Sequence, residues 1–293
     1  MPELPEVEHV VRALRRAVVG RTIIATEINL PKLIAPTTPS LFKRKLKNLT
    51  ITGVSRRGKF ILIELGRPGA LLSDAERGNR KPARQQGQVL LVHLRMTGKF
   101  LYLNSEEELP KHSHAVFYLD NERRLVFRDQ RQFGIMRLAP AAQLSQTKGI
   151  AELAPEPFSE EFSVDYLREV FRRSTRSLKT FLLDQTRVLG LGNIYAVEAL
   201  FRARINPFRP VNKLSAKRVA RLHAAIQEVL DFAIQHIRGG FNLEEGFSYG
   251  EAFERFWQVY EREGEACVNC GTRIRRITHG GRSTYWCPRC QRS

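Results

Sequence analysis

The sequence predicts an α+β protein in which a β-rich domain is followed by a helical domain and a small metal-binding module. Three observations lead to this prediction: a series of short strand-like segments in the first half, apolar periodicity of helical type in the second half, and four cysteines confined to the C-terminal end. With 293 residues, the chain is long enough for about two domains of ordinary size.

The first domain begins with an amphipathic helix that ends at Gly20. Its apolar residues recur every three or four positions, at Val7, Val10, Val11, Leu14 and Val18. Eight short runs rich in β-forming residues follow, and they predict a sandwich or a barrel. They are Thr22–Leu30, Leu49–Ser55, Phe60–Leu65, Gln88–Leu94, Phe100–Leu103, Ala115–Leu119, Arg124–Arg128 and Gly134–Leu138. We assign residues 2–139 to this domain, as an N-terminal helix and an eight-stranded β-sandwich.

A linker follows, which we place at residues 140–163 because Pro155 and Pro157 lie there among Ser and Glu residues. We predict a helical domain over residues 164–260 and a separate module over residues 261–293. The predicted helices are Val164–Arg173, Leu178–Asp184, Ile194–Arg204 and Ala216–Ile237. Within the first domain, Arg67–Gly87 lacks periodicity and is predicted to be an exposed basic loop, more a solvated insertion than a phosphate-binding segment.

The charge balance points to a polyanionic partner. The chain has 48 Lys and Arg against 30 Asp and Glu, a net charge of +18, and its pI is near 10.3. Such a surplus repels itself and is typical of nucleic-acid-binding proteins, although a merely soluble basic protein is an alternative. No apolar run approaches the roughly 20 residues of a membrane span, and the N-terminus does not resemble a secretory signal. We therefore expect a cytoplasmic protein with no membrane contact.

The four cysteines form two C-x-x-C pairs, as Cys267-x2-Cys270-x16-Cys287-x2-Cys290. A hairpin of that length brings the pairs together into a four-sulfur tetrahedral site that suits one Zn²⁺. Because protein ligands fill all four positions, we expect the zinc to be structural and not catalytic. Arginines within and after the module favour a nucleic-acid contact, although such ribbons also bind proteins.

A glycine-rich turn, Leu189-Gly190-Leu191-Gly192-Asn193-Ile194-Tyr195, separates two of the predicted helices. Asn193 is a candidate cap for the second helix. The free N–H groups at that helix N-terminus can bind a phosphate, and Lys179 on the preceding helix can join them. An ordinary tight turn is the alternative, which the net charge and the basic module make less favourable.

The N-terminus suggests covalent chemistry. Removal of Met1 leaves Pro2 with a secondary amine, whose pKa of about 8 leaves roughly a tenth of it neutral at pH 7. Such an amine can attack C1′ of a sugar, expel the base and form an iminium. Glu3 and Glu6 supply carboxyl groups for proton transfer beside it. The alternative is a proline at a helix start, followed by acidic residues that match the helix dipole.

Together these motifs resemble the formamidopyrimidine-DNA glycosylases, a bacterial base-excision repair family that also includes endonuclease VIII. The resemblance rests on the start Pro2-Glu3-Leu4-Pro5-Glu6-Val7-Glu8, the Gly-Leu-Gly-Asn-Ile-Tyr turn and the four-cysteine zinc finger, and it covers residues 2–291 apart from the Arg67–Gly87 insertion. It implies a bifunctional DNA glycosylase and AP lyase, acting as a monomer on damaged double-stranded DNA in the bacterial nucleoid. The implied substrates are oxidised purines such as 8-oxoguanine and formamidopyrimidines, processed by Schiff-base chemistry and β,δ-elimination without an organic cofactor.

The resemblance also implies roles for individual residues. Pro2 is the Schiff-base nucleophile, and Glu3 is the acid that protonates the opened sugar ring. Lys59 matches the lysine that acts near the lesion phosphate and in β-elimination, and Arg282 the finger arginine of phosphate binding and δ-elimination. Further matches to DNA-contacting positions are His112, Arg131, Lys179 and Asn193, the last two in a helix-two-turn-helix motif.

Met96, Arg131 and Phe133 match the three side chains with which the family fills the gap left by a flipped base. Extruding a base costs a few kcal/mol of stacking, which an apolar wedge can partly recover, and an arginine can pair with the orphaned base. On residue type alone, core packing of Met96 and Phe133 and a solvated Arg131 would be the simpler interpretation.

Two departures from the family stand out: the first loosens a turn, and the second concerns substrate preference. The chain has Asp129-Gln130-Arg131 where the family usually has Asp-Pro-Arg. The stretch Phe241–Gln258, which in the family includes the loop over flipped 8-oxoguanine, is shorter than usual. Two alternatives therefore stay open: an endonuclease VIII-like glycosylase of oxidised pyrimidines, and a zinc-ribbon DNA-binding protein without catalysis.

Overall fold

The computed structural model describes residues 2–67, 87–236 and 256–292. Within them the chain divides into two compact units: the first comprises Pro2 and residues 6–151, and the second comprises residues 3–5, 152–236 and 256–292. The four-part division with boundaries after residues 139, 163 and 260 stays a prediction. The predicted loop Arg67–Gly87 and the stretch Phe241–Gln258 lie almost wholly outside the described residues.

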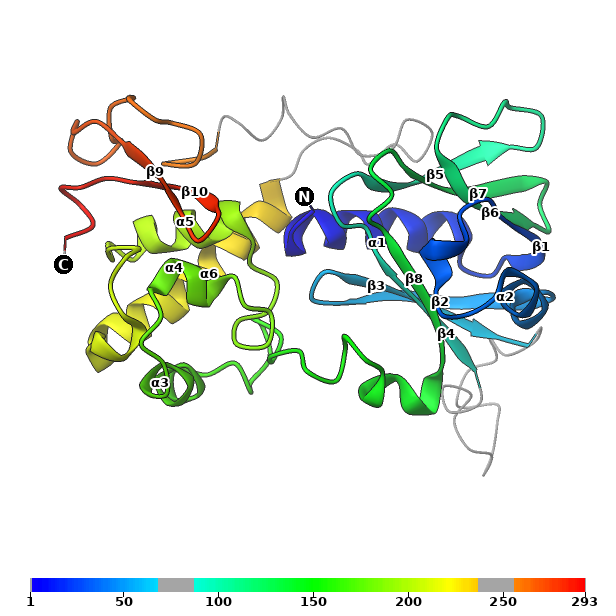
Figure 1. Cartoon of the computed structure of the whole chain (residues 1–293), viewed down its shortest axis with the longest axis horizontal. Coiled ribbons are helices and arrows are strands. Elements are labelled where there is room, and N and C mark those ends of the chain that lie inside the picture. Colours follow the sequence, from blue (N-terminus) through cyan, green and yellow to red (C-terminus); the bar gives the residue numbers. More distant parts are fainter. Residues whose placement is uncertain (1, 68–86, 237–255, 293) are drawn as a thin grey trace. The chain divides into compact units, whose positions relative to one another are not determined.

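The first unit consists mainly of one helix and one antiparallel sheet (Figure 1). The helix α1 spans Leu4–Val18. All eight predicted strands are confirmed, and they are hydrogen-bonded in the order β5-β7-β6-β1-β2-β3-β4-β8. Their bounds are β1 Thr22–Ile28, β2 Leu49–Arg57, β3 Phe60–Gly66, β4 Gln88–His93, β5 Gly98–Asn104, β6 Ser113–Leu119, β7 Arg123–Asp129 and β8 Ile135–Pro140.

Both halves of the sheet contribute to one core, as the predicted sandwich requires. Alternate residues of β3 and β4 share a buried cluster with residues of β5, β6, β7 and α1. Representative members are Ile61, Ile63, Leu90, Val92, Phe100, Phe117, Phe127, Val10 and Leu14. The opposite face of β5–β7 forms a second, smaller cluster of Leu101, Leu103, Val116 and Val126.

The short helix α2 (Pro39–Leu46) is not among the predicted elements. Its N-terminus is nevertheless well specified, because the Thr38 hydroxyl accepts a 3.4 Å hydrogen bond from the Leu41 N–H and a proline occupies the first helical position. Only Phe42 and Leu46 of this helix are buried. Two buried apolar residues beside three basic ones give too short a pattern for periodicity to detect.

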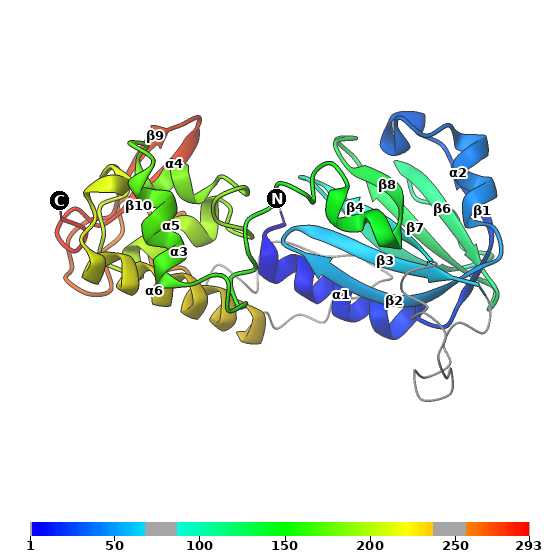
Figure 2. The ribbon, with the colours of Figure 1, turned by 90° about the horizontal axis from the view of Figure 1, so that it is seen from below.

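The second unit contains the four predicted helices and the finger (Figure 2). They are α3 Val164–Arg172, α4 Leu178–Leu182, α5 Asn193–Arg202 and α6 Ala216–His236, and the finger carries the hairpin β9 Arg275–His279 and β10 Arg282–Trp286. The helices bury a common cluster that includes Leu167, Phe171, Phe181, Tyr195 and Leu222. Within the described ranges, no helix is both long and apolar enough to cross a bilayer.

Candidate active site

The Glu3 carboxylate lies at the N-terminus of α5. It accepts backbone hydrogen bonds from Gly192 (2.5 Å), Ile194 (2.9 Å) and Tyr195 (3.3 Å). Glu3 is only 2% exposed, and the positive end of the helix stabilises its negative charge. A carboxylate of the protein therefore occupies these three N–H groups in this structure. Phosphate contacts of Asn193 and Lys179 at this turn stay predictions.

The glycines of the turn make room for this contact. A Cβ at Gly192 would overlap the Glu3 carboxyl group, and a Cβ at Gly190, where φ is +88°, would overlap the Leu4 side chain. Gly192 and not Asn193 is the N-cap of α5, so the capping prediction is wrong. Asn193 is the first helical residue, and its buried Oδ1 atom has no hydrogen-bond partner within the described part of the chain.

Pro2 and Glu6 flank Glu3 at the start of α1, and both are buried. Lys59, 5% exposed, lies in the tight turn between β2 and β3, where Gly58 has a φ of +55°. In both ribbon views this turn lies beside the N-terminal end of α1 (Figures 1 and 2). The structure thus brings the predicted lysine to the end of the helix that carries the predicted nucleophile.

His93 is a neighbour of Lys59 that the sequence analysis missed. Its ring packs edge-on against Phe60, with ring centroids 4.8 Å apart. Burial, together with the charges of Arg95 and Lys59, lowers the pKa of His93 to about 3, so the ring is neutral at physiological pH. What reveals its role is the pairing of His93 with Phe60 between β4 and β3. The sequence alone does not give the register of these two strands, so it does not give this pairing.

The two loops that carry the candidate wedge residues are tied together by Asp129, which is 1% exposed. The Thr97 hydroxyl donates to one Asp129 carboxylate oxygen and accepts a 3.0 Å hydrogen bond from the Arg131 N–H. The other oxygen accepts a 2.7 Å hydrogen bond from the Gly134 N–H. The Asp129 N–H in turn donates to the carbonyl of His112, which places that residue beside the same loops.

The side chains of this group project into solvent. Met96 is 42% exposed and Phe133 52% exposed, so the interpretation of both as core residues is wrong. The Arg131 guanidinium lies 5.0 Å from the centre of the Phe133 ring, within cation–π distance. An exposed cluster of two apolar side chains and one arginine is suited to stacking against bases.

Lys179 and Arg282 form a pair of like charges. Lys179 on α4 is fully buried, and burial together with the charge of Arg282 lowers its pKa to about 8. The β9–β10 turn is held against α4 by a 2.7 Å hydrogen bond between Ser177 and His279. No ion pair neutralises either cation in the described ranges. Two adjacent unneutralised cations are the arrangement that an anion such as phosphate relieves.

The four cysteines come together as the spacing predicts. Their sulfurs lie within 4.8 Å of one another, with Cys267 and Cys290 3.9 Å apart and Cys270 and Cys287 3.5 Å apart. A zinc ion with Zn–S bonds of about 2.3 Å needs sulfurs roughly 3.8 Å apart at the corners of a tetrahedron, so the donor set fits zinc. The finger also packs on α5 through a cluster that includes Val197 and Phe201.

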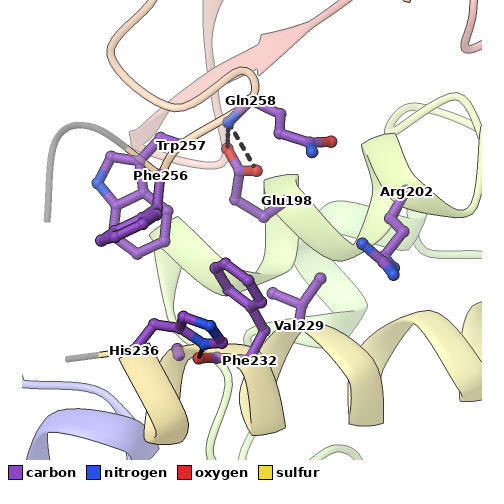
Figure 3. A pocket seen from close by; sticks show the side chains of 9 residues that line it. Glu198, Arg202, Val229, Phe232, His236, Phe256, Trp257 and Gln258 are labelled. Atoms are coloured by element: carbon purple, nitrogen blue, oxygen red, sulfur yellow. Dashed lines mark hydrogen bonds between the residues drawn. The ribbon is translucent and has the colours of Figure 1, made fainter.

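Glu198, a carboxylate in the middle of α5, was also missed. It is 5% exposed and accepts hydrogen bonds from three consecutive N–H groups, those of Gln258, Val259 and Tyr260, at 2.8 to 3.2 Å. Figure 3 shows it pointing from α5 towards Gln258, at the edge of a pocket whose lining includes aromatic side chains of α6 and of residues 256–257. Nothing in the sequence distinguishes this glutamate from a surface residue.

Comparison with known proteins shows which family the chain belongs to. Three family models match: the formamidopyrimidine-DNA glycosylase N-terminal domain over residues 1–136, the H2TH domain over residues 153–244, and the zinc finger found in FPG and IleRS over residues 264–292. The formamidopyrimidine-DNA glycosylase of Pelotomaculum thermopropionicum is 41% identical over 100% of this chain and 99% of its own. That of Bacillus subtilis is 40% identical over 99% of each chain.

Solved structures agree with the sequence matches. A MutM complex with DNA that contains carbocyclic 8-oxo-G has a TM-score of 0.85 and 34% identity, over 100% of both chains. The Lactococcus lactis Fpg complex with DNA that contains an abasic site has the same TM-score and identity, over 99% of this chain. The chain therefore belongs to the formamidopyrimidine-DNA glycosylase family and is a DNA glycosylase of base excision repair.

Proposed function

We propose that the chain is a bifunctional DNA glycosylase and AP lyase that removes oxidised purines from duplex DNA, with the Pro2 amine as nucleophile. The observation that carries the proposal is the fixation of Glu3, directly next to Pro2, by three N–H groups at the start of α5. A protein that only bound DNA would need neither a free N-terminal proline nor an adjacent, rigidly held carboxyl group.

The chemistry begins after removal of Met1. The Pro2 nitrogen forms a bond to C1′ of the lesion nucleotide, the glycosidic bond breaks, and the base leaves with the proton that the amine loses. The nitrogen lone pair then forms the iminium as the C1′–O4′ bond breaks and O4′ takes a proton from Glu3. Glu3 enters this step as the neutral carboxylic acid and leaves it as the carboxylate that the N–H groups of α5 stabilise. Loss of a proton from C2′ expels the 3′ phosphate, and a second elimination expels the 5′ phosphate.

Most of the remaining predicted residues contact the DNA. Lys59, Lys179, Asn193, Arg282 and His112 contact phosphates, and Glu6 supports proton transfer beside Pro2. Met96, Arg131 and Phe133 occupy the space left by the flipped nucleotide. One zinc ion on Cys267, Cys270, Cys287 and Cys290 holds the finger folded, so that Arg282 is presented from a rigid hairpin. We expect a cytoplasmic monomer with one zinc per chain.

Oxidised purines are the favoured substrates, but structures of a relative make oxidised pyrimidines a second candidate class of substrate. Structures of the Lactococcus lactis enzyme contain DNA with a Fapy-dG and, in another case, DNA with an oxidised pyrimidine. The experiment below therefore also tests an endonuclease VIII-like preference for pyrimidine lesions.

The test is borohydride trapping on duplexes that carry a single 8-oxoguanine, formamidopyrimidine or 5-hydroxyuracil. We expect a covalent adduct whose peptide maps to Pro2, formed fastest with the purine lesions, and we expect Pro2→Gly and Glu3→Gln to abolish base excision in a folded protein. Faster trapping on 5-hydroxyuracil would favour the pyrimidine alternative. Excision retained in either variant would overturn the assignment of the nucleophile and acid.

A further inference from the structure

Helix α1 is fastened to strand β2 at two points. The Arg56 Nε atom donates a 2.8 Å hydrogen bond to Oε2 of Glu8. About two helical turns further on, Arg15 donates two hydrogen bonds of 2.9 and 3.0 Å to the carbonyl of Val54. A helix and a strand joined at two points cannot slide or rotate against each other without breaking one of these contacts.

The Glu8–Arg56 ion pair is well shielded from water. The side chains of Glu8 and Arg56 are only 18% and 14% exposed, and they belong to different elements of the fold. Burial alone would raise the pKa of Glu8, but the hydrogen bond and charge of Arg56, with those of Arg12, hold it below its ordinary value. An ion pair of this kind contributes more than an exposed one, because solvent screens it less.

The structure supplies a matched control for this pair. Arg12 donates a 2.9 Å hydrogen bond to the other carboxylate oxygen of Glu8, but it is 45% exposed and lies on the same helix, four residues along. It therefore shares the partner and the chemistry of Arg56 without linking α1 to the sheet.

Both elements carry reactive groups at their adjoining ends. Glu6 lies in the first turn of α1 and Pro2 precedes the helix, two and six residues before Glu8 along the chain. Lys59 lies three residues after Arg56, in the two-residue turn with Gly58 that joins β2 to β3. The two views place this turn beside the start of α1 (Figures 1 and 2). The ion pair thus sits between the element that carries the amine and the element that carries the lysine.

We propose that the Glu8–Arg56 ion pair is a positioning device that holds the Pro2 amine and Lys59 in register for Schiff-base formation and elimination. This inference rests on the proposed function of Pro2 and Lys59. Neither Glu8 nor Arg56 touches the substrate; both act by fixing how α1 lies on β2. A displacement of about 1 Å between reacting groups lowers a rate by as much as a hundredfold. An ion pair that prevents such a displacement therefore preserves the rate of the reaction.

The experiment measures single-turnover borohydride trapping of the full-length zinc-loaded protein on the 8-oxoguanine duplex. The variants are Glu8→Ala, Arg56→Ala, the double variant, Arg56→Lys and the control Arg12→Ala. We expect a tenfold to hundredfold loss in the limiting rate for Glu8→Ala and Arg56→Ala, on the order of what misplacement costs. The duplex concentration at half-maximal rate should not change, and the double variant should lose no more than either single one.

Two variants separate positioning from general destabilisation. Arg56→Lys restores an ammonium beside Glu8 and should recover most of the rate, and Arg12→Ala should match the wild type. A wild-type rate in Arg56→Ala would overturn the positioning role, as would a loss in Arg12→Ala equal to that in Arg56→Ala or a change confined to duplex affinity. Absence of any adduct from the wild type would instead overturn the proposed function itself, and this inference with it.

Discussion

The Tyr260 backbone N–H donates a 2.8 Å hydrogen bond to the Glu198 carboxylate in the middle of α5. It is the last of three consecutive N–H groups that converge on that carboxylate. Burial raises the pKa of Glu198, and these three donors oppose the rise. The carboxylate thereby fixes the segment that leads into the finger on the same helix that holds Glu3.

Replacement of Glu198 by alanine should therefore destabilise the protein strongly. Three buried N–H groups would lose their acceptor, and we expect the free energy of unfolding to fall by about 3 kcal/mol. Denaturant unfolding of the zinc-loaded protein measures this loss. Glu228 is the matched control, since its ion pair with Arg202 is about half exposed, and Glu228→Ala should change stability by less than about 0.5 kcal/mol. Equal effects of the two substitutions would refute the anchoring role.

Affinity for DNA should fall as the pH rises through 8. Lys179 has its pKa lowered to about 8 in the free protein by burial and by Arg282. A bound phosphate stabilises the charged form and raises that pKa, so the protein that binds best is the protonated one. Affinity for a duplex with an abasic-site analogue, measured from pH 7 to 9 at constant salt, should drop above pH 8 in the wild type.

The same titration on Lys179→Arg identifies the group responsible. Arginine stays charged throughout this range, so the decline between pH 8 and 9 should disappear. The exposed Lys148 offers a control, and Lys148→Arg should keep the wild-type profile. An unchanged profile in Lys179→Arg would assign the effect to another group.

Phe133→Ala should slow the excision of a lesion from duplex DNA. With the ring removed, the gap left by the flipped nucleotide loses its stacking partner, and we expect kcat/KM to fall by about tenfold, or 1.4 kcal/mol. Phe158 is a control with similar exposure, 45% against 52%, in the segment before α3. Phe158→Ala should be active like the wild type, and a comparable loss in both variants would argue against the wedge.

Gly192→Ala should impair excision because the new Cβ displaces the Glu3 carboxyl group. We expect a rate loss on the order of a hundredfold, the cost of misplacing a catalytic group by about 1 Å. Gly264→Ala is the comparison: nothing lies within 4 Å of a Cβ there, and only the φ of +81° is unfavourable, at about 1 kcal/mol of stability. Single-turnover excision assays separate the two, and full activity in Gly192→Ala would contradict the close packing of Glu3 against the turn.

Removal of zinc should unfold the finger and leave the sheet of the first unit intact. The sheet has its own buried cluster, whereas the finger contributes only a few apolar residues to a cluster shared with α5. Hydrogen exchange after chelation should show lost protection in residues 264–292 and unchanged protection in β3 and β4. Loss of protection throughout both regions would show that the zinc supports the whole chain.

Much of this architecture could be predicted because its signals are local. The eight strands, the N-terminal helix, the four helices of the second unit and the cysteine cluster each follow from residue type and spacing, and the structure confirms them. The short helix α2 escaped because two buried residues do not establish a period.

The details of the site depended on contacts between distant residues. Which group occupies the start of α5 is decided by Glu3, 191 positions before Ile194 in the chain, and not by the local Gly-Leu-Gly-Asn pattern. The importance of Glu198 and His93 depends on a chain segment and a strand register that only the folded structure defines. Spacing can therefore identify candidate residues, but it cannot say what lies opposite them.

The length of helix α5 sets the spacing between three contacts of the second unit. Its ten residues, about 15 Å of axis, carry the Glu3 contacts at one end, the Glu198 anchor in the middle, and Val197 and Phe201 under the finger. One inserted or deleted residue would rotate everything beyond it by about 100° relative to the Glu3 end. The length of this helix should consequently be as restricted in evolution as the identity of the residues that it presents.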